Sequence, residues 1–197
     1  MTIVERAKRV CLSPDSEWSI IAGERAQMSA LIVGYVLPLA GVAAAAQAIG
    51  ESIVGRSLGI LGTYRMPLTT ALGLAVASLA LAAVGVVLLS IVIDALAPTF
   101  GAEKSREQAL KVAVYAATPA WLAGVLQILP ALGVVALLGG LYALYLLYLG
   151  LPRLMKCPAD KAVGYTATVI ACAFVMALVG SSITARIFGV GATVLLR

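Results

Sequence analysis

Residues that could do acid–base, nucleophilic or metal chemistry are scarce in this sequence. Its 197 residues include no histidine, nine acidic residues and three cysteines. The lack of histidine removes the commonest general base and the best neutral metal ligand. Cys11, Cys157 and Cys172 cannot form a disulfide framework, and we interpret them as small buried or interfacial thiols. We therefore predict no catalytic site, no metal site and no cofactor, and we expect that the protein is not an enzyme.

Asp94 is the one carboxylate near the interior of a long apolar stretch. Burial of such a charge is costly unless a cation or a helix N-terminus satisfies it. Lys104, Lys111 and Lys161 are the candidates for that cation. Two interpretations stay open, a solvated charge at the level of the lipid headgroups and a buried group with a functional role. No second carboxylate shares the site, so aspartate-dyad chemistry is not predicted.

Three tyrosines, Tyr142, Tyr145 and Tyr148, recur every three residues along another apolar stretch. On a helix they share one broad face. Such a face is typical of helix packing or of an aromatic belt at a membrane surface. The alternative is a polar cavity lined by their hydroxyl groups.

The elements that must position these residues are membrane helices. The chain is 62% hydrophobic and only 12% charged, whereas soluble domains are about 25% charged. A helix needs roughly 20 apolar residues to cross a bilayer. We predict an all-α polytopic membrane protein with five transmembrane helices in one compact domain over residues 29–197. The predicted spans lie near residues 29–49, 67–93, 112–129, 131–151 and 163–185.

The connection between the third and fourth predicted spans is the least polar one. Proline cannot continue the hydrogen-bond ladder of a helix, and glycine permits a reversal of the chain. Residues 129–133, which include Pro130 and Gly133, are therefore predicted to form a tight hairpin. The second predicted span is longer than a bilayer requires, so we expect it to tilt.

The basic residues predict the orientation of the chain, because they favour cytoplasmic connections. With the N-terminus inside, ten of the 14 lysines and arginines lie on the cytoplasmic side. The other four are Arg56, Arg65, Arg186 and Arg197. We therefore predict an N-in, C-out topology. The net charge of +5 is explained by this distribution and does not indicate nucleic-acid binding.

Residues 1–28 are predicted to form an N-terminal segment with an amphipathic helix that lies on the membrane. A second helix is expected to begin at Ser13 and Pro14, with Trp18 at the depth of the membrane interface. The alternative is a face that docks a cytoplasmic partner. The apolar members of the first helix are Ile3, Val4, Ala7, Val10 and Cys11.

Several motifs, taken in their order along the chain, resemble one family of membrane proteins. The motifs are WSIIAGE (18–24), YVLP (35–38), DALAPTFG (94–101), QALKVAVYAATPAW (108–121), ILP (128–130), GLYALY (140–145), and GLPRLMK (150–156) followed by DKA (160–162). Nearly the whole chain is similar to the YIP family, which is named for proteins that interact with Ypt/Rab GTPases. The resemblance is closest in style to prokaryotic members.

The resemblance implies a cytoplasmic N-terminus, five spans and a non-enzymatic role in membrane organisation or trafficking. The chain does not match the long hydrophilic N-terminal region of eukaryotic members, so GTPase binding is not carried over. We expect a small cytoplasm-facing dent beside Asp94, near a kink at Pro119, which binds a partner protein or a lipid headgroup. The residues assigned to this partner- or lipid-binding site are Asp94, Gly101, Tyr115, Pro119, Pro130 and Lys161, with Trp18 and Glu24 from the N-terminal segment.

The favoured function is a membrane scaffold or partner-binding protein. The alternative is a small-solute transporter or channel subunit, for which Pro38, Pro119, the glycine-rich residues 55–62 and the three tyrosines could supply a broken-helix pathway. The expected partners are anionic lipid headgroups at the cytoplasmic connectors and an unidentified membrane or cytoplasmic protein. Small-residue faces also allow a homo-oligomer. The expected location is a prokaryotic cytoplasmic membrane.

Overall fold

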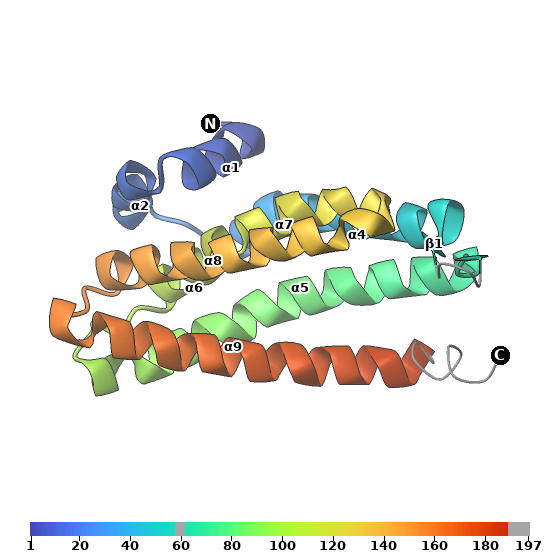
Figure 1. Ribbon diagram of the computed structural model, residues 1–197. Coiled ribbons are helices and arrows are strands. Elements are labelled where there is room, and N and C mark those ends of the chain that lie inside the picture. The colour runs from blue at the N-terminus through green and yellow to red at the C-terminus, as the bar shows by residue number, and fades with distance from the viewer. Residues whose placement is uncertain (58–61, 189–197) are drawn as a thin grey trace.

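Long apolar helices run side by side in a bundle, as Figure 1 shows for the computed structural model of the chain. The structure describes residues 1–57 and 62–188. Within that part, five helical segments are long and apolar enough to cross a membrane: Met28–Val54, Leu68–Phe100, Arg106–Ile128, Pro130–Leu154 and Ala159–Phe188. These segments confirm the all-α membrane fold and the five predicted transmembrane helices.

Two short helices precede the bundle, α1 (Ile3–Leu12) and α2 (Pro14–Gly23). The first long segment is divided into α3 (Met28–Leu31), η1 (Ile32–Val36), α4 (Leu37–Ile49) and η2 (Gly50–Val54). The strands β1 (Arg56–Ser57) and β2 (Thr63–Tyr64) follow. The remaining elements are α5 (Leu68–Leu96), η4 (Ala97–Phe100), α6 (Arg106–Ala116), α7 (Thr118–Gly124), η5 (Val125–Ile128), η6 (Pro130–Leu132), α8 (Gly133–Leu154) and α9 (Ala159–Phe188).

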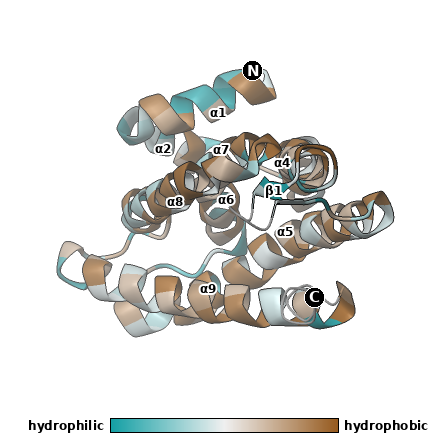
Figure 2. Ribbon diagram, turned by 45° about the vertical axis from the view of Figure 1, so that its right-hand side comes forward, coloured by the Kyte–Doolittle hydropathy of each residue, from teal (hydrophilic) through white to brown (hydrophobic). Residues whose placement is uncertain are grey.

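The two ends of the bundle differ in what covers them. The connectors 101–105 and 155–158 lie at the same end of the bundle as α2 (Figure 1). We call this the hairpin end, after the helical hairpin that α1 and α2 form. The strand pair and the turn between η5 and α8 lie at the opposite, far end (Figure 1). Apolar residues cover the long helices along their length, whereas hydrophilic residues gather on α1 (Figure 2).

Two of the long segments are interrupted. In the first, η1 and η2 are π-helical turns, a form that occurs mostly as local bulges in α-helices. In the third, α6 ends before Ala117, and α7 begins with Pro119 in its first turn. Because proline has no N–H to donate, it is favoured in the first turn of a helix and weakens the hydrogen-bond ladder elsewhere. The break expected at Pro119 is therefore present.

The connection between α7 and α8 reverses the chain as predicted, but glycine is not the cause. Leu129 is extended, with φ −111° and ψ 101°, and Pro130 begins η6. Gly133 has a helical φ of −55°, so it does not use the conformational freedom of glycine. The reversal is made by the extended Leu129 and the proline that follows it.

The sequence did not predict the small antiparallel pair of β1 and β2, in which Arg56 lies opposite Tyr64. Gly55 precedes it with φ +83°, and a Cβ there would lie 2.7 Å from the side chains of Thr63 and Arg65. Only glycine fits that position without strain. Residues 58–61 of the glycine-rich 55–62 stretch, and Arg197 from the charge count, lie outside the described residues.

The helix α6 forms the centre of the core. Every residue from Ala109 to Ala116 is buried. The membrane-spanning segment that contains α6 is the most buried of the five. Inside the protein, 61% of its most apolar stretch is buried, whereas the figure for each of the other four segments is 28% or less. A helix that carries Lys111 on its buried side needs polar partners inside the protein. The two N-terminal helices supply those partners.

The α1–α2 hairpin packs on the bundle through its apolar residues. Ala7 and Val10 of α1 are buried, as are Trp18 and Ile21 of α2. The Trp18 side chain contacts protein, because it is 1% exposed and lies against Gly150 of α8, and its depth at the membrane interface stays a prediction. The missing side chain at position 150 leaves room for the indole ring. The amphipathic helix lying on the membrane stays a prediction.

Candidate functional site

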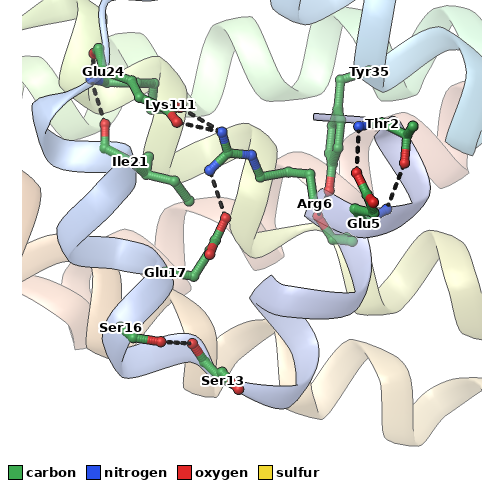
Figure 3. A network of polar contacts seen from close by, with 11 residues as sticks. Thr2, Glu5, Arg6, Ser13, Ser16, Glu17, Ile21, Glu24, Tyr35 and Lys111 are labelled. Atoms are coloured by element: carbon green, nitrogen blue, oxygen red, sulfur yellow. Dashed lines mark hydrogen bonds and ion pairs between the residues drawn. The ribbon is translucent and has the colours of Figure 1, made fainter.

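The first helix begins with a capping box that fixes its direction (Figure 3). The Glu5 N–H donates to the Thr2 hydroxyl at 3.2 Å, and the Thr2 N–H donates to the Glu5 carboxylate at 2.9 Å. The bond from the Thr2 backbone lowers the pKa of Glu5, because it favours the charged form of the carboxyl. These two bonds satisfy N–H groups that would otherwise lack a partner.

Arg6 joins α1 to α2 and to the core (Figure 3). Its guanidinium donates to Glu17 at 2.6 Å and to both carboxylate oxygens of Glu24 at 2.6 and 2.7 Å. Its central carbon lies 5.7 Å from the centre of the Tyr115 ring, within cation–π range. Burial opposes the charge, yet the bonds to Glu24 prevail and raise the pKa of Arg6. Arg6 is therefore a fixed, charged link.

Lys111 holds the C-terminal end of α2 (Figure 3). Its side chain is 1% exposed, and its ammonium donates to the carbonyls of Ile21 at 3.0 Å and Glu24 at 2.7 Å. The Glu107 carboxylate lies 3.7 Å away. The last carbonyls of a helix lack internal partners and carry partial negative charge. Lys111 thus caps α2, which explains how a lysine is buried in the core.

Two neighbours of Lys111 on α6 bind the chain that follows α2. The Glu107 carboxylate accepts from the Ala26 N–H at 2.8 Å. The Gln108 side-chain amide donates to the Ala22 carbonyl at 2.9 Å. The backbone from Ala22 to Ala26 is thereby tied to one helix of the core.

A second line of contacts joins the hairpin to α8. Arg153, near the end of α8, pairs with Asp15 at the start of α2. The Tyr142 hydroxyl donates to the Cys11 carbonyl at the end of α1, at 2.7 Å. Tyr142 and Arg153 are 11 residues apart, which is roughly 16 Å along a helix. Both contacts are made at the turn between α1 and α2, so this turn is held to α8 from two positions along that helix.

Two aromatic residues next to Arg6 connect the α1–α2 hairpin to the two interrupted membrane helices. The rings of Tyr35 and Tyr115 meet edge to face with their centres 5.0 Å apart. The Tyr35 hydroxyl and the Thr118 hydroxyl share a buried hydrogen bond of 3.0 Å. Tyr35 lies in the π-helical η1, and Thr118 begins α7 just after the break. One chain of contacts thus runs from Arg6 to both irregular segments.

The two connectors at the hairpin end bind each other. The Glu103 N–H donates to the Met155 carbonyl at 2.8 Å, and the Glu103 carboxylate pairs with Lys156 at 2.8 Å. Gly101 has φ +69°, and a Cβ there would lie 3.7 Å from the Lys161 ammonium. Burial raises the pKa of the Cys157 thiol, which lies 3.6 Å from the Phe100 carbonyl. The connectors form one ordered surface.

Asp94 is buried without the cation that we expected for it. Its side chain is 9% exposed, and its Oδ1 atom has no hydrogen-bond partner. No ion pair reaches Asp94 from any described residue. Of the three expected lysines, Lys111 donates its hydrogen bonds to backbone carbonyls at the end of α2, and Lys104 and Lys161 are exposed. The interpretation of Asp94 as a solvated surface charge is wrong.

The predicted dent does not form as one polar cluster in the described part of the chain. Tyr115 lies under Arg6, Lys161 lies beside Gly101, and Asp94 is joined to neither by a hydrogen bond or ion pair. Pro119 begins α7 next to Thr118, and Pro130 lies in the turn at the far end. Trp18 and Glu24 belong to the hairpin contacts.

The sequence analysis missed the polar cluster of the hairpin: it did not single out Arg6 and Glu17, and it named Lys111 only as a candidate partner of Asp94. One signal was present in the pattern. Arg6 lies among the otherwise apolar positions of α1, and Lys111 lies in a helix whose next residues are all apolar. A charge on the buried side of a helix requires an opposite charge or a free carbonyl. That requirement pointed to the acidic residues of α2.

The comparisons agree with the motifs. The Yip1 domain matches residues 8–180 of the chain. The chain is also similar to the "Inner membrane protein YohC" of Escherichia coli strain K12, with 26% identity over 181 residues, which cover 90% of this chain and 93% of that protein. The protein of the same name from Escherichia coli O6:H1 matches equally well. No solved structure matches the chain.

Proposed function

This multi-span membrane protein belongs to the Yip1 domain family, and from that premise we propose that it is a non-enzymatic scaffold in a prokaryotic inner membrane. The scaffold binds a partner protein and anionic lipid headgroups at the hairpin end, which faces the cytoplasm in an N-in, C-out arrangement. The inner-membrane location rests on the name of the similar YohC protein. The orientation rests on the excess of basic residues at the hairpin end.

The observation that carries this proposal is the order of the hairpin end. The α1–α2 hairpin is joined there to α6 and α8 by hydrogen bonds and an ion pair, and the two connectors are joined to each other by a backbone hydrogen bond and an ion pair. A surface that is ordered before binding loses less conformational entropy when a partner docks. The fixed hairpin end is thus suited to binding, and the described residues contain no group of metal ligands beside it.

Exposed cations support the lipid part of the proposal. Lys104, Arg106 and Lys161 are exposed at the connectors and have no ion-pair partner among the described residues. Each basic residue near an anionic leaflet contributes on the order of 1 kcal/mol of attraction. These side chains therefore favour anionic over zwitterionic headgroups.

Crosslinking followed by copurification from native membranes tests the scaffold function. The variant carries Lys104→Gln and Lys161→Gln, and the matched control carries Arg65→Gln and Arg186→Gln at the far end. We expect the first variant to lose crosslinked protein and anionic lipid, and the control to retain both. Identical protein and lipid sets from the two variants would remove the proposal. Point variants are preferable to deletion of residues 1–28, which would uncover Lys111 and the site of Trp18.

The interrupted helices favour a second candidate, a small-solute transporter or channel subunit. Breaks in membrane helices are typical of transporter sites, and here η1 and the break before α7 meet at Tyr35 and Thr118. The pocket between α4 and α5, near Gln47 and Glu51, has a volume of only about 10 Å³, the size of one water molecule. Solute uptake by reconstituted vesicles above that of protein-free vesicles would support this candidate.

A further inference from the structure

The carboxylate of Asp94 is buried where α5 packs beside α9 (Figure 1). Its Oδ1 atom is enclosed by protein and has no hydrogen-bond partner among the described residues. Ser90 lies one turn earlier on α5 and is 5% exposed, so its hydroxyl group shares one face of the helix with the carboxylate. Tyr165 of α9 is fully buried, and its hydroxyl group reaches the carbonyl of Ile93, the residue before Asp94. Two helices thus place three oxygen-bearing side chains at one level of the bundle.

Neither hydroxyl group is free to donate a hydrogen bond to the carboxylate. A hydroxyl group carries a single proton. Ser90 donates that proton to the Val87 carbonyl at 2.7 Å, and Tyr165 donates its own to the Ile93 carbonyl at 2.5 Å. Both oxygens keep only lone pairs, and a carboxylate also only accepts. The site therefore holds acceptor oxygens and lacks a donor.

A small cation supplies what the site lacks. A buried carboxylate without a compensating charge is costly, and no ion pair of the described residues includes Asp94. Hard cations bind carboxylate, hydroxyl and carbonyl oxygens. A single carboxylate balances one positive charge. The described residues hold no group of three or more histidine, cysteine, aspartate or glutamate side chains that would bind a divalent or transition metal. The chemistry therefore fits a monovalent ion.

We propose that Asp94, with Ser90 and Tyr165, binds a sodium ion between α5 and α9. The carboxylate supplies the charge, and the two hydroxyl oxygens are neutral ligands. Asp94 lies six residues before Phe100, the end of its membrane-spanning segment, which is roughly 10 Å along the helix. The ion therefore has a short path from the water at the hairpin end. The inference does not depend on the scaffold role.

Thermal unfolding of the purified full chain in detergent tests the site. Sodium, potassium and choline chloride are compared at equal concentration. We expect sodium to raise the melting temperature above that in potassium or choline. Asp94→Asn should abolish this response, whereas Asp160→Asn, which removes an exposed acid of α9, should retain it. Without sodium, Asp94→Asn should melt higher than the unchanged protein, because an amide costs less to bury than a carboxylate. Loss of the response is then not loss of the fold.

Ser90→Ala and Tyr165→Phe test the neutral ligands. Each removes one oxygen, and the phenyl ring at position 165 can still stack on Phe100. Each should raise the sodium concentration that gives half of the temperature shift by about tenfold or more. Ser181→Ala is the matched control, because Ser181 also donates to the carbonyl three residues earlier but is exposed. It should leave the sodium concentration unchanged.

Labelling with dicyclohexylcarbodiimide gives a second readout. This apolar reagent attacks carboxyl groups that carry a proton, and a bound sodium ion takes the place of that proton. At a sodium concentration about tenfold above the Kd, labelling of Asp94 should fall about tenfold, as mass spectrometry of its peptide measures. Equal melting temperatures and equal labelling in sodium and choline would overturn the proposal. A sodium response that survives in Asp94→Asn, or a potassium response of the same size, would also overturn it.

Discussion

Trp18 of α2 packs directly on Gly150 of α8. A Cβ atom at position 150 would lie 2.8 to 3.0 Å from three atoms of the indole ring. The contact joins residues 132 positions apart in the sequence. It makes the N-terminal hairpin an integral part of the bundle.

Replacement of Gly150 by alanine is expected to lower stability. The new methyl group must displace a buried indole ring, and overpacking of this kind costs about 1–3 kcal/mol. Thermal unfolding of the purified protein measures the loss. Gly140→Ala is the control on the same helix, because a Cβ at Gly140 has no neighbour within 4 Å. The control should be neutral or stabilise by up to about 1 kcal/mol. Equal melting temperatures for both variants would contradict the packing.

Lys111→Met should destabilise the protein strongly. The change leaves the carbonyls of Ile21 and Glu24 without their donor and removes the cation beside Glu107. A buried carbonyl that loses its donor costs about 1–3 kcal/mol, whereas the pair with Glu107, which is 44% exposed, contributes no more than about 1 kcal/mol. Chemical denaturation in detergent measures this loss. Lys104→Met, at an exposed position, should change stability by less than about 0.5 kcal/mol. A Lys111 variant as stable as the Lys104 variant would show that the cap does not matter.

Asp94→Asn should raise stability. Asp94 is buried, and its Oδ1 atom lacks a partner, and a neutral amide costs about 1 kcal/mol less than a carboxylate to bury without a hydrogen-bond partner. The melting temperature of the purified variant checks this. Asp15→Asn is the control, because it removes an exposed pair with Arg153 and should lower stability by no more than about 1 kcal/mol. A lower melting temperature for Asp94→Asn would mean that the carboxylate is satisfied.

Alkylation of Cys157 should have a pH midpoint above 9.0, the ordinary thiol value, because burial raises the pKa of this thiol. The neutral thiol is favoured in the folded state, so its contribution to stability is present below pH 9.0 and is lost as pH rises through the folded pKa. Iodoacetamide labelling across pH, with Cys11 and Cys172 replaced by serine, measures the midpoint. The same chain unfolded in detergent should react with a midpoint near the ordinary value. A folded midpoint at or below it would contradict the burial.

The membrane helices could be predicted from sequence because their signal is local. Twenty apolar residues in a row identify a span whatever the rest of the chain does, and Pro130 marked the reversal between the third and fourth. The helix break near Pro119 followed from the missing N–H of proline. Family motifs then identified the Yip1 domain before any contact was known.

The candidate site could not be predicted in the same way, because its contacts join distant segments. Trp18 has the pattern of an interfacial residue, and only the position of Gly150 on α8 reveals that it is buried. Lys111 satisfies backbone carbonyls about 90 residues earlier in the chain, which no local motif records. Asp94 was assigned a lysine partner from charge alone. In the structure, Lys111 lies beside Glu107 and Lys161 lies beside Gly101, so neither pairs with Asp94.

Hydrogen exchange of the full chain in lipid nanodiscs tests most directly whether the hairpin is a fixed part of the hairpin end. The amides of residues 17–21, in the middle of α2, should exchange as slowly as those of residues 109–115 in α6, because the two helices are joined through Lys111 and Gln108. Protection of α6 with free exchange in α2 would show that the hairpin opens in the membrane, and would contradict the account.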